Sequence, residues 1–221
     1  MIEYIVPSNI DERKLTRACT LLADGNLLAL PTDTSWSIVC SLKSIAGIRK
    51  LKTRSGERDE RHFTLLCSDI SQFGEWCSMD NSQFRLIRRL VPGPYVFVLK
   101  TLIGTDKVLG LHRKEIGIRI SNHPVPQAII KALGSPLYSI TAKHTMLPDY
   151  QAPDVGSENA DDFPVIPEEA LFEGGWELES LEGVSMVLDT GLDQERLFST
   201  VLDLSGDTVQ LLRAGAGEWP V

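Results

Sequence analysis

The chain has 221 residues, of which 43% are hydrophobic and 24% charged, and its formal net charge at pH 7 is -8. This length suits one large α/β domain or two small ones, and the composition is ordinary for a globular protein. No apolar run approaches the roughly 18 residues of a membrane span, and the first residues lack a basic segment followed by an apolar stretch, so we predict a cytoplasmic protein without a span or a secretory signal.

The first part of the chain is predicted to alternate helices with short strands. A helix starts at residues 8–11, which offer a capping side chain and an acid for its first turn, and Gly25 supplies its stop. A short amphipathic helix with apolar residues at 45, 48 and 51 carries Lys52 and Arg54 at its C-terminal end. A short buried strand is expected at 27–30, and further strands at 36–40 and 63–67.

The remaining elements continue the alternation. Helices are expected at 69–77, 80–90 and 124–133, and strands at 95–100, 116–120, 137–141, 184–188, 200–204 and 209–213. The helix at 80–90 should bury a stripe formed by Phe84, Ile87 and Val91. Because strands and helices alternate through most of the chain, we predict one α/β domain, residues 1–221, with a mixed sheet.

Charge is unevenly distributed along the chain. Residues 1–143 carry 20 Lys and Arg against 13 Asp and Glu, whereas residues 144–195 carry 14 Asp and Glu and no Lys or Arg. The net charges are therefore +7 and -14. An acidic, proline-rich loop is expected at about 148–182, and it is either a solvated loop or part of a field that steers an anionic ligand to the basic body.

Several common sites are missing from the sequence. There is no Walker-type phosphate loop, no dinucleotide fingerprint followed by a helix, and no Gly-x-Ser-x-Gly elbow. The histidines have no metal-ligand spacing, and we predict no metal site built from protein side chains. Cys19, Cys40, Cys67 and Cys77 form no Cys-x-x-Cys pair and are expected to be reduced core thiols.

A cluster of positive charge suggests a phosphate ligand. Lys52 and Arg54 precede a turn-rich loop, and His62 stands at the start of the next predicted strand. Arg can hold phosphate oxygens in a fork, and Lys acts as a mobile point charge. A plainer alternative is that both cations are a solvated helix end, favoured by the helix dipole.

Short motifs follow one another through nearly the whole chain. They are Pro31-Thr32-Asp33-Thr34, Lys52-Thr53-Arg54, Pro92-Gly93-Pro94, Ile116-Gly117-Ile118-Arg119 before His123-Pro124, Ser139-Ile140-Thr141-Ala142-Lys143, and Ser199-Thr200 followed by Arg213 and Gly215. In this order and spacing the chain resembles the YrdC-like family, the threonylcarbamoyl-adenylate synthases. The blocks HFTLLC and DTVQLLRAGAG are most similar to its YciO branch.

The resemblance implies a fold and an activity. The fold would be a twisted open sheet flanked by helices, with a deep, positively charged cleft. The substrates would be ATP, L-threonine and bicarbonate, with Mg²⁺ expected from the triphosphate chemistry. The products would be threonylcarbamoyl-AMP and pyrophosphate, which makes the chain a nucleotidyltransferase that serves the t6A modification of tRNA.

The same resemblance assigns roles to residues that match the family motifs. Lys52 and Arg54 would be catalytic. The nucleotide would contact Arg54, Thr141, Lys143 and Arg213. Threonine would contact Thr32, Thr34, His62, Arg119, Ser139 and Ser199. Adenylation brings a carbamate against the α-phosphate, and fixed cations in a water-poor cleft offset the repulsion of these two anions.

A different class of function stays open. The cleft could bind nucleotide or RNA, either tRNA or double-stranded RNA, without adenylation. The basic residues 1–143 motivate this alternative, as does Lys143, which stands where the family has an Asn. A vestigial site is the third hypothesis, in which the threonines and serines are ordinary turn and strand residues.

Overall fold

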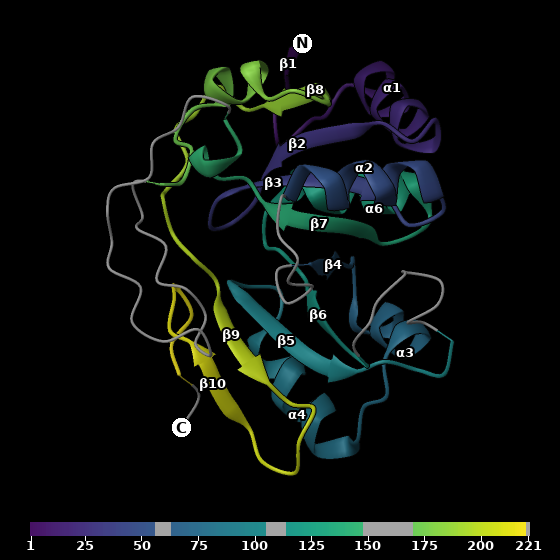
Figure 1. The fold of residues 1–221 in the computed structure, drawn as a ribbon. Coiled ribbons are helices and arrows are strands. Elements are labelled where there is room, and N and C mark those ends of the chain that lie inside the picture. Colours follow the sequence, from purple (N-terminus) through teal and green to yellow (C-terminus); the bar gives the residue numbers. More distant parts are fainter. Residues whose placement is uncertain (56–62, 105–113, 148–169, 220–221) are drawn as a thin grey trace.

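The structure is a computed structural model, and it describes residues 1–55, 63–104, 114–147 and 170–219. Within these residues one mixed sheet has the strand order β1-β8-β2-β3-β7-β4-β6-β5-β9-β10 (Figure 1). The strands are β1 (Ile2–Tyr4), β2 (Leu27–Pro31), β3 (Trp36–Ser41), β4 (Thr64–Leu66), β5 (Tyr95–Lys100), β6 (Glu115–Arg119), β7 (Leu137–Thr141), β8 (Val184–Asp189), β9 (Thr200–Asp203) and β10 (Gln210–Arg213). The predicted α/β fold with an open mixed sheet flanked by helices is confirmed.

Helices cover both faces of the sheet in its N-terminal half. The helix α1 (Glu12–Ala23) lies beside α6 (Pro124–Leu133), and α2 (Ile45–Ser55) packs on β3 and β7. Successive residues of β2 point to opposite faces, so Leu28 and Leu30 join the cluster of α1 and α6, while Leu27 and Ala29 join that of α2. This is why β2 is apolar throughout and fully buried.

Capping residues fix where the helices begin and end. Asp11 caps α1 by accepting the N–H of Arg13 at 2.7 Å, so the helix begins at the end of the predicted 8–11 start. Gly25, with φ of 78°, provides the left-handed residue that ends it. His123 caps α6, whose Pro124 occupies the first helical position as predicted.

The helix α4 (Asn81–Leu90) corrects one prediction. Asp80 and Gln83 form a capping box at its start, and Ile87 is fully buried. Phe84, however, is 38% exposed and Val91 is only half-buried, so the predicted buried stripe is reduced to Ile87 and its neighbours. The helix packs on the core through Ile87 and its partly buried neighbours.

Several short elements were not predicted from the sequence. The edge strand β1 was not predicted. The predicted helix at 69–77 consists of a 3₁₀ turn, η2 (Ile70–Gln72), followed by α3 (Phe73–Trp76). Two further 3₁₀ turns, η3 (His144–Met146) and η5 (Gly175–Ser180), follow β7 and precede β8. Most of the predicted acidic loop, 148–169, lies outside the described residues.

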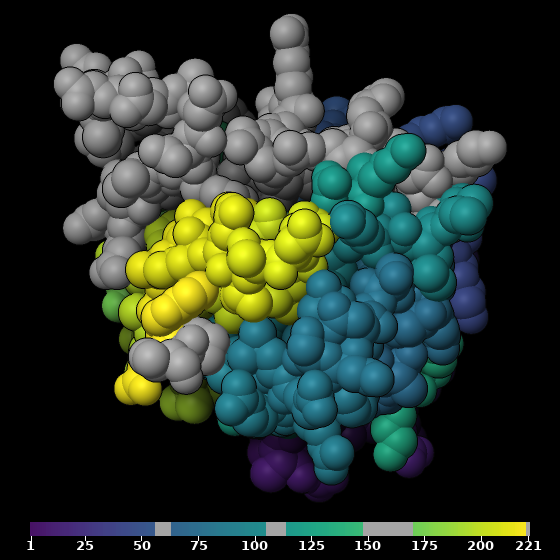
Figure 2. Space-filling view, turned by 90° about the horizontal axis from the view of Figure 1, so that it is seen from below, coloured from purple at the N-terminus to yellow at the C-terminus, as the bar shows by residue number. Residues whose placement is uncertain are grey.

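The C-terminal strands complete the second half of the sheet. The strand β9 runs parallel to β5, and β10 pairs antiparallel with β9. Figure 2 shows these strands, in yellow, against the blue surface of the segment that contains α4 and β5. The amide of Gln83 donates to the carbonyl of Leu204 at 2.6 Å and ties α4 to this pair.

Two bulk features complete the description. All four cysteines are free, and Cys40, Cys67 and Cys77 are buried, whereas Cys19 is half-buried. Burial raises the pKa of Cys40 and of Cys77 to about 12, so these thiols stay protonated. Among the helices in the described ranges, none is long and apolar enough to cross a membrane.

Candidate functional site

A cleft lies over the middle of the sheet and encloses about 760 Å³ of space, part of it open to solvent. Seven strands contribute to its lining, from β3 on one side to β10 on the other. In β5 the alternation of side chains turns Val96 and Val98 toward the cleft, while Phe97 and Leu99 face the core. The polar lining consists of Ser37, Ser55, Thr64, Arg119, Ser139, Thr141, Lys143, Ser199 and Arg213.

The turn after β2 presents Asp33 and Thr34 to the site. The hydroxyl of Thr32 donates to the carbonyl of Ser35 at 2.6 Å and accepts the N–H groups of Thr34 and Ser35, each at 3.2 Å. Thr32 is 2% exposed, so its side chain stabilises the turn from within. The carbonyl of Thr34 accepts the N–H of Leu197 at 3.3 Å, which brings the segment before β9 beside this turn.

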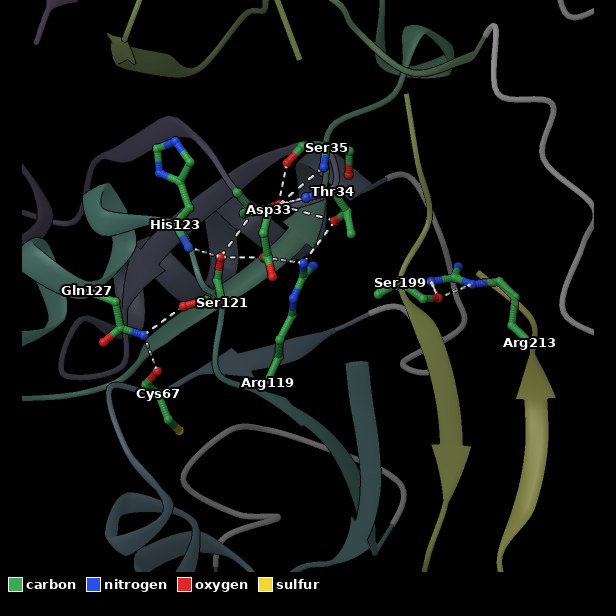
Figure 3. A network of polar contacts seen from close by, with 11 residues as sticks. Asp33, Thr34, Ser35, Cys67, Arg119, Ser121, His123, Gln127, Ser199 and Arg213 are labelled. Carbon is green, nitrogen blue, oxygen red and sulfur yellow. Dashed lines mark hydrogen bonds and ion pairs between the residues drawn. The ribbon is translucent and has the colours of Figure 1, made fainter. Parts of the chain in front are cut away.

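Asp33 and Arg119 form a buried ion pair at the end of β6 (Figure 3). Arg119 Nη2 donates to Asp33 Oδ1 at 2.6 Å and to Thr34 Oγ1 at 3.0 Å. Ser121 Oγ donates to the same Asp33 oxygen at 2.5 Å. Burial alone would raise the pKa of Asp33, but Arg119, Ser121 and backbone N–H groups outweigh it and lower that pKa.

Arg213 is held differently. Its Nε and Nη2 donate to the carbonyl of Ser199 at 3.1 and 2.9 Å, and Nη2 also contacts Ser199 Oγ at 3.2 Å. The guanidinium lies over the ring of Phe198, 4.9 Å from its centroid. Gly215 packs closely on the backbone of the same segment, where a Cβ would meet the carbonyl oxygen of Phe198 at 2.3 Å.

The two arginines repel each other across the cleft. Burial and then the charge of Arg119 lower the pKa of Arg213 to about 10, and burial lowers that of Arg119. Both groups are still charged at neutral pH. Among the described residues, Asp33 pairs with Arg119, and no carboxylate lies within ion-pair distance of Arg213. The local field therefore favours an anionic ligand.

The third cationic part of the cleft follows β7. Lys143 is 5% exposed and lines the cleft, as does Met146 in the next turn. The carbonyl of Met146 accepts a hydrogen bond from the guanidinium of Arg54 on the last turn of α2. Ser55, which also lines the cleft, donates its hydroxyl to the carbonyl of Lys52 at 2.8 Å.

The structure brings most of the predicted site residues together. Arg119, Ser139, Thr141, Lys143, Ser199 and Arg213 line the cleft directly. Thr34 contacts Arg119, which lines the cleft. Lys52 and Arg54, the predicted catalytic residues, are not among the lining residues: the backbone carbonyl of Lys52 accepts the hydroxyl of Ser55, and the guanidinium of Arg54 donates to the carbonyl of Met146. Thr32 serves the turn, and His62 lies outside the described residues. The ligand roles of all these residues stay predictions.

Four residues that shape the site received no role from the sequence. Asp33 lies between two predicted threonine contacts, and its place in the Pro31-Thr32-Asp33-Thr34 motif was the available signal. Ser121, Phe198 and Met146 act through a single hydroxyl, a ring face and a carbonyl. Each depends on a neighbour far away in the chain, and no local pattern reveals that neighbour.

Comparison with known proteins identifies the family. Residues 20–162 match the model of the Sua5/YciO/YrdC family, which carries the description "Telomere recombination". The chain belongs to this family. It is 29% identical to the uncharacterized protein YciO of Escherichia coli K12 over 219 residues, covering 97% of this chain and 95% of that one.

The solved structure of E. coli YciO has a TM-score of 0.79 and 28% identity, and the match covers 99% of this chain and 97% of that one. P. abyssi Sua5 complexed with L-threonine has a TM-score of 0.76 and 18% identity, over 97% of this chain and 57% of that one, which shows a shared fold. A threonylcarbamoyl-AMP synthase of Xanthomonas axonopodis is 26% identical over 60% of this chain and 72% of its own length.

Proposed function

We propose that the cleft binds ATP and a small amino acid, with L-threonine as the first candidate, and transfers the adenylyl group to the carbamoylated amino acid. The product would be threonylcarbamoyl-AMP, released with pyrophosphate for the t6A modification of tRNA. The name of the Xanthomonas relative, threonylcarbamoyl-AMP synthase, and the threonine complex of P. abyssi Sua5 support this choice of substrate.

One observation carries the proposal. Arg119 and Arg213 face the same cleft, repel each other, and are matched by one carboxylate among the described residues. Anionic groups of the two substrates lying between them would replace this repulsion by two attractions in a partly buried site. Within the described residues Asp33 Oδ2 and Arg119 Nε are also buried without a hydrogen-bond partner, which leaves an acceptor and a donor for a ligand.

The geometry suggests a division of roles. On the β7 side Lys143, with Arg54 behind Met146, would bind phosphate oxygens. On the turn side Arg119 would bind the amino acid carboxylate and Thr34 its polar groups. Arg213 would stabilise charge that develops where the two substrates meet. Bicarbonate would enter as the source of the carbamate carbon.

Mg²⁺ would accompany ATP as its counter-ion. In the described ranges no three His, Cys, Asp or Glu side chains are grouped as metal ligands. Phosphate oxygens and water would therefore supply most of the ligands, which suits the octahedral oxygen coordination that Mg²⁺ prefers.

Pyrophosphate release tests the proposal. The protein is incubated with ATP, L-threonine, bicarbonate and Mg²⁺, with Arg213→Ala as the reference variant. We expect threonine-dependent release that falls about 100-fold or more in the variant, because preorganised charge contacts contribute that much to rate. Equal release with and without threonine, or in both proteins, would contradict adenylation of threonine.

The alternative function predicts a different result in the same experiment. A nucleotide- or RNA-binding protein would bind ATP or RNA and release no pyrophosphate. Lys143 is the residue that favours this alternative, because it places an ammonium group where an Asn would both donate and accept. RNA binding that weakens steeply with salt and persists without ATP would support it.

A further inference from the structure

The cationic side of the cleft is supported from behind by a His–Glu contact outside the motifs. His144 Nε2 lies 3.0 Å from Glu177 Oε2, and both side chains are 18% exposed. His144 follows Lys143 directly and begins the turn η3, whereas Glu177 belongs to η5, which follows residues 170–174.

Glu177 uses both of its oxygens. While Oε2 contacts His144, Oε1 accepts the N–H groups of Glu173 and Gly174, each at 2.9 Å. Burial would raise the pKa of Glu177, but the N–H groups of Gly174 and Glu173, and then His144, lower it. The carboxylate is therefore fixed in place as an anion that holds the start of η5 against η3.

Further contacts hold His144 and the segment before η5 in place. The ring of His144 packs edge-on against the fully buried Phe172, with 4.4 Å between ring centroids. Lys143 forms an isolated antiparallel bridge with Leu171. The carbonyl of Glu173 accepts the indole N–H of Trp36 at 3.2 Å and thereby joins the segment to β3.

The turn η3 transmits this anchoring to the cleft. Lys143 precedes His144, and Met146 closes the turn by donating its N–H to the carbonyl of Lys143 at 3.0 Å. Lys143 and Met146 both line the cleft, and the carbonyl of Met146 holds Arg54. A shift of His144 would move Lys143, which lines the cleft, and the carbonyl of Met146, which holds Arg54 behind the cleft.

We propose that Glu177, acting through His144, is a positioning residue that sets the phosphate-binding geometry of Lys143 and Arg54. It touches no substrate itself. The inference rests on the proposed function, since it assumes that the β7 side of the cleft receives the triphosphate. The turn that holds Asp33, Thr34 and Arg119 is stabilised by hydrogen bonds that do not involve Glu177.

Two ligands separate positioning from general stability. Melting shifts are measured with Mg-ATP alone and with L-threonine alone, for the wild type, Glu177→Ala and Glu179→Gln. Glu179 is the matched control: it lies on the same turn, its side chain is 55% exposed, and its ion pair is with the N-terminal amine at 3.6 Å. We expect Glu177→Ala to lower the affinity for Mg-ATP about 10-fold or more, by analogy with outer partners that orient metal ligands. The melting shift with L-threonine should stay unchanged.

The conservative variant Glu177→Gln keeps the inference testable even if Glu177→Ala folds poorly. Gln can still accept the two N–H groups and contact the ring of His144, so we expect it to restore most of the ATP affinity. Equal loss of both ligands, or wild-type ATP affinity in Glu177→Ala, would overturn the positioning role. If the wild type binds neither ligand, the proposed function fails first, and the two failures are distinguished.

Discussion

The two arginines of the cleft illustrate two ways to bury a cation. Arg119 is 6% exposed and paired with Asp33, whose second partner is Ser121. Arg213 is held by the carbonyl and hydroxyl of Ser199 and by the ring of Phe198, which orient it without neutralising its charge. The difference is one of charge: Arg119 has a carboxylate partner, whereas no carboxylate among the described residues lies within ion-pair distance of Arg213.

The largest expected effect comes from breaking the paired side. Asp33→Ala leaves Arg119 buried without its counter-ion, and removal of one partner of a buried pair costs about 3–5 kcal/mol. We expect the free energy of unfolding in urea to fall by that amount. Asp193→Ala, at an exposed acid, is the control and should change it by less than about 0.5 kcal/mol. Similar small losses in both variants would show that the pair does not stabilise the fold.

On the unpaired side, the effect should fall on binding. Arg213→Ala removes a cation without removing an ion pair among the described residues. We expect a stability loss below that of Asp33→Ala, at about 1–3 kcal/mol, because the carbonyl of Ser199 loses its donor. ATP should bind roughly 10-fold to 100-fold more weakly, the range for hydrogen bonds to charged groups. Calorimetric titration measures the second effect. Lys131→Ala, an exposed cation on α6, should leave ATP affinity unchanged.

A smaller effect is expected from a change that removes one hydrogen bond to Asp33 and keeps its ion pair with Arg119. Ser121→Ala removes the hydroxyl that donates to Asp33 at 2.5 Å and keeps the ion pair. We expect a loss of about 1–3 kcal/mol in the free energy of unfolding, as for other buried acceptors that lose a donor. ATP affinity should stay within a factor of about three. A stability loss as large as that of Asp33→Ala would assign the main role to Ser121.

The smallest effect is a pH dependence on the side of Asp33 and Arg119. Burial lowers the pKa of His123, only partly opposed by Asp33, so the folded protein keeps the ring neutral and its Nδ1 accepts the N–H of Val125. The unfolded chain takes up a proton as pH falls below about 6.5, so stability is lost from there downward. His123→Asn keeps a capping oxygen and removes this titration.

The stability of His123→Asn relative to the wild type should therefore rise as pH falls from about 7 to about 5. Asp33 loses its own contribution on the acid side in both proteins, because its pKa is lowered in the folded state. The difference between their melting temperatures at each pH isolates His123. A constant difference over this range would show that the ring titrates normally in the folded protein.

The sequence predicted most of the fold because its signals are local. Strands β5 and β7 and helix α6 were predicted with their observed bounds, since alternation, Pro124 and flanking turns mark them. Phe84 was misplaced because periodicity gives the spacing of a face and not which neighbours cover it. The edge strand β1 has only three residues, and its pairing with β8 depends on a partner about 180 residues away.

Much of the site was also predictable, but through motifs. Arg119, Ser199 and Arg213 were placed in one cleft by the order of motifs that resemble a family. What the motifs could not give is the state of each charge. That Arg119 already has Asp33 as a partner, and that Glu177 supports Lys143 through His144, follows from contacts between segments 86 and 33 residues apart.

We propose that anionic groups bind between Arg119 and Arg213. The most direct test is calorimetric titration of Mg-ATP into the wild type and Arg213→Ala at two salt concentrations. The account predicts binding to the wild type that weakens as salt rises, and an affinity roughly 10-fold to 100-fold lower in the variant. Equal affinity in both proteins, or no heat of binding to the wild type, would contradict it.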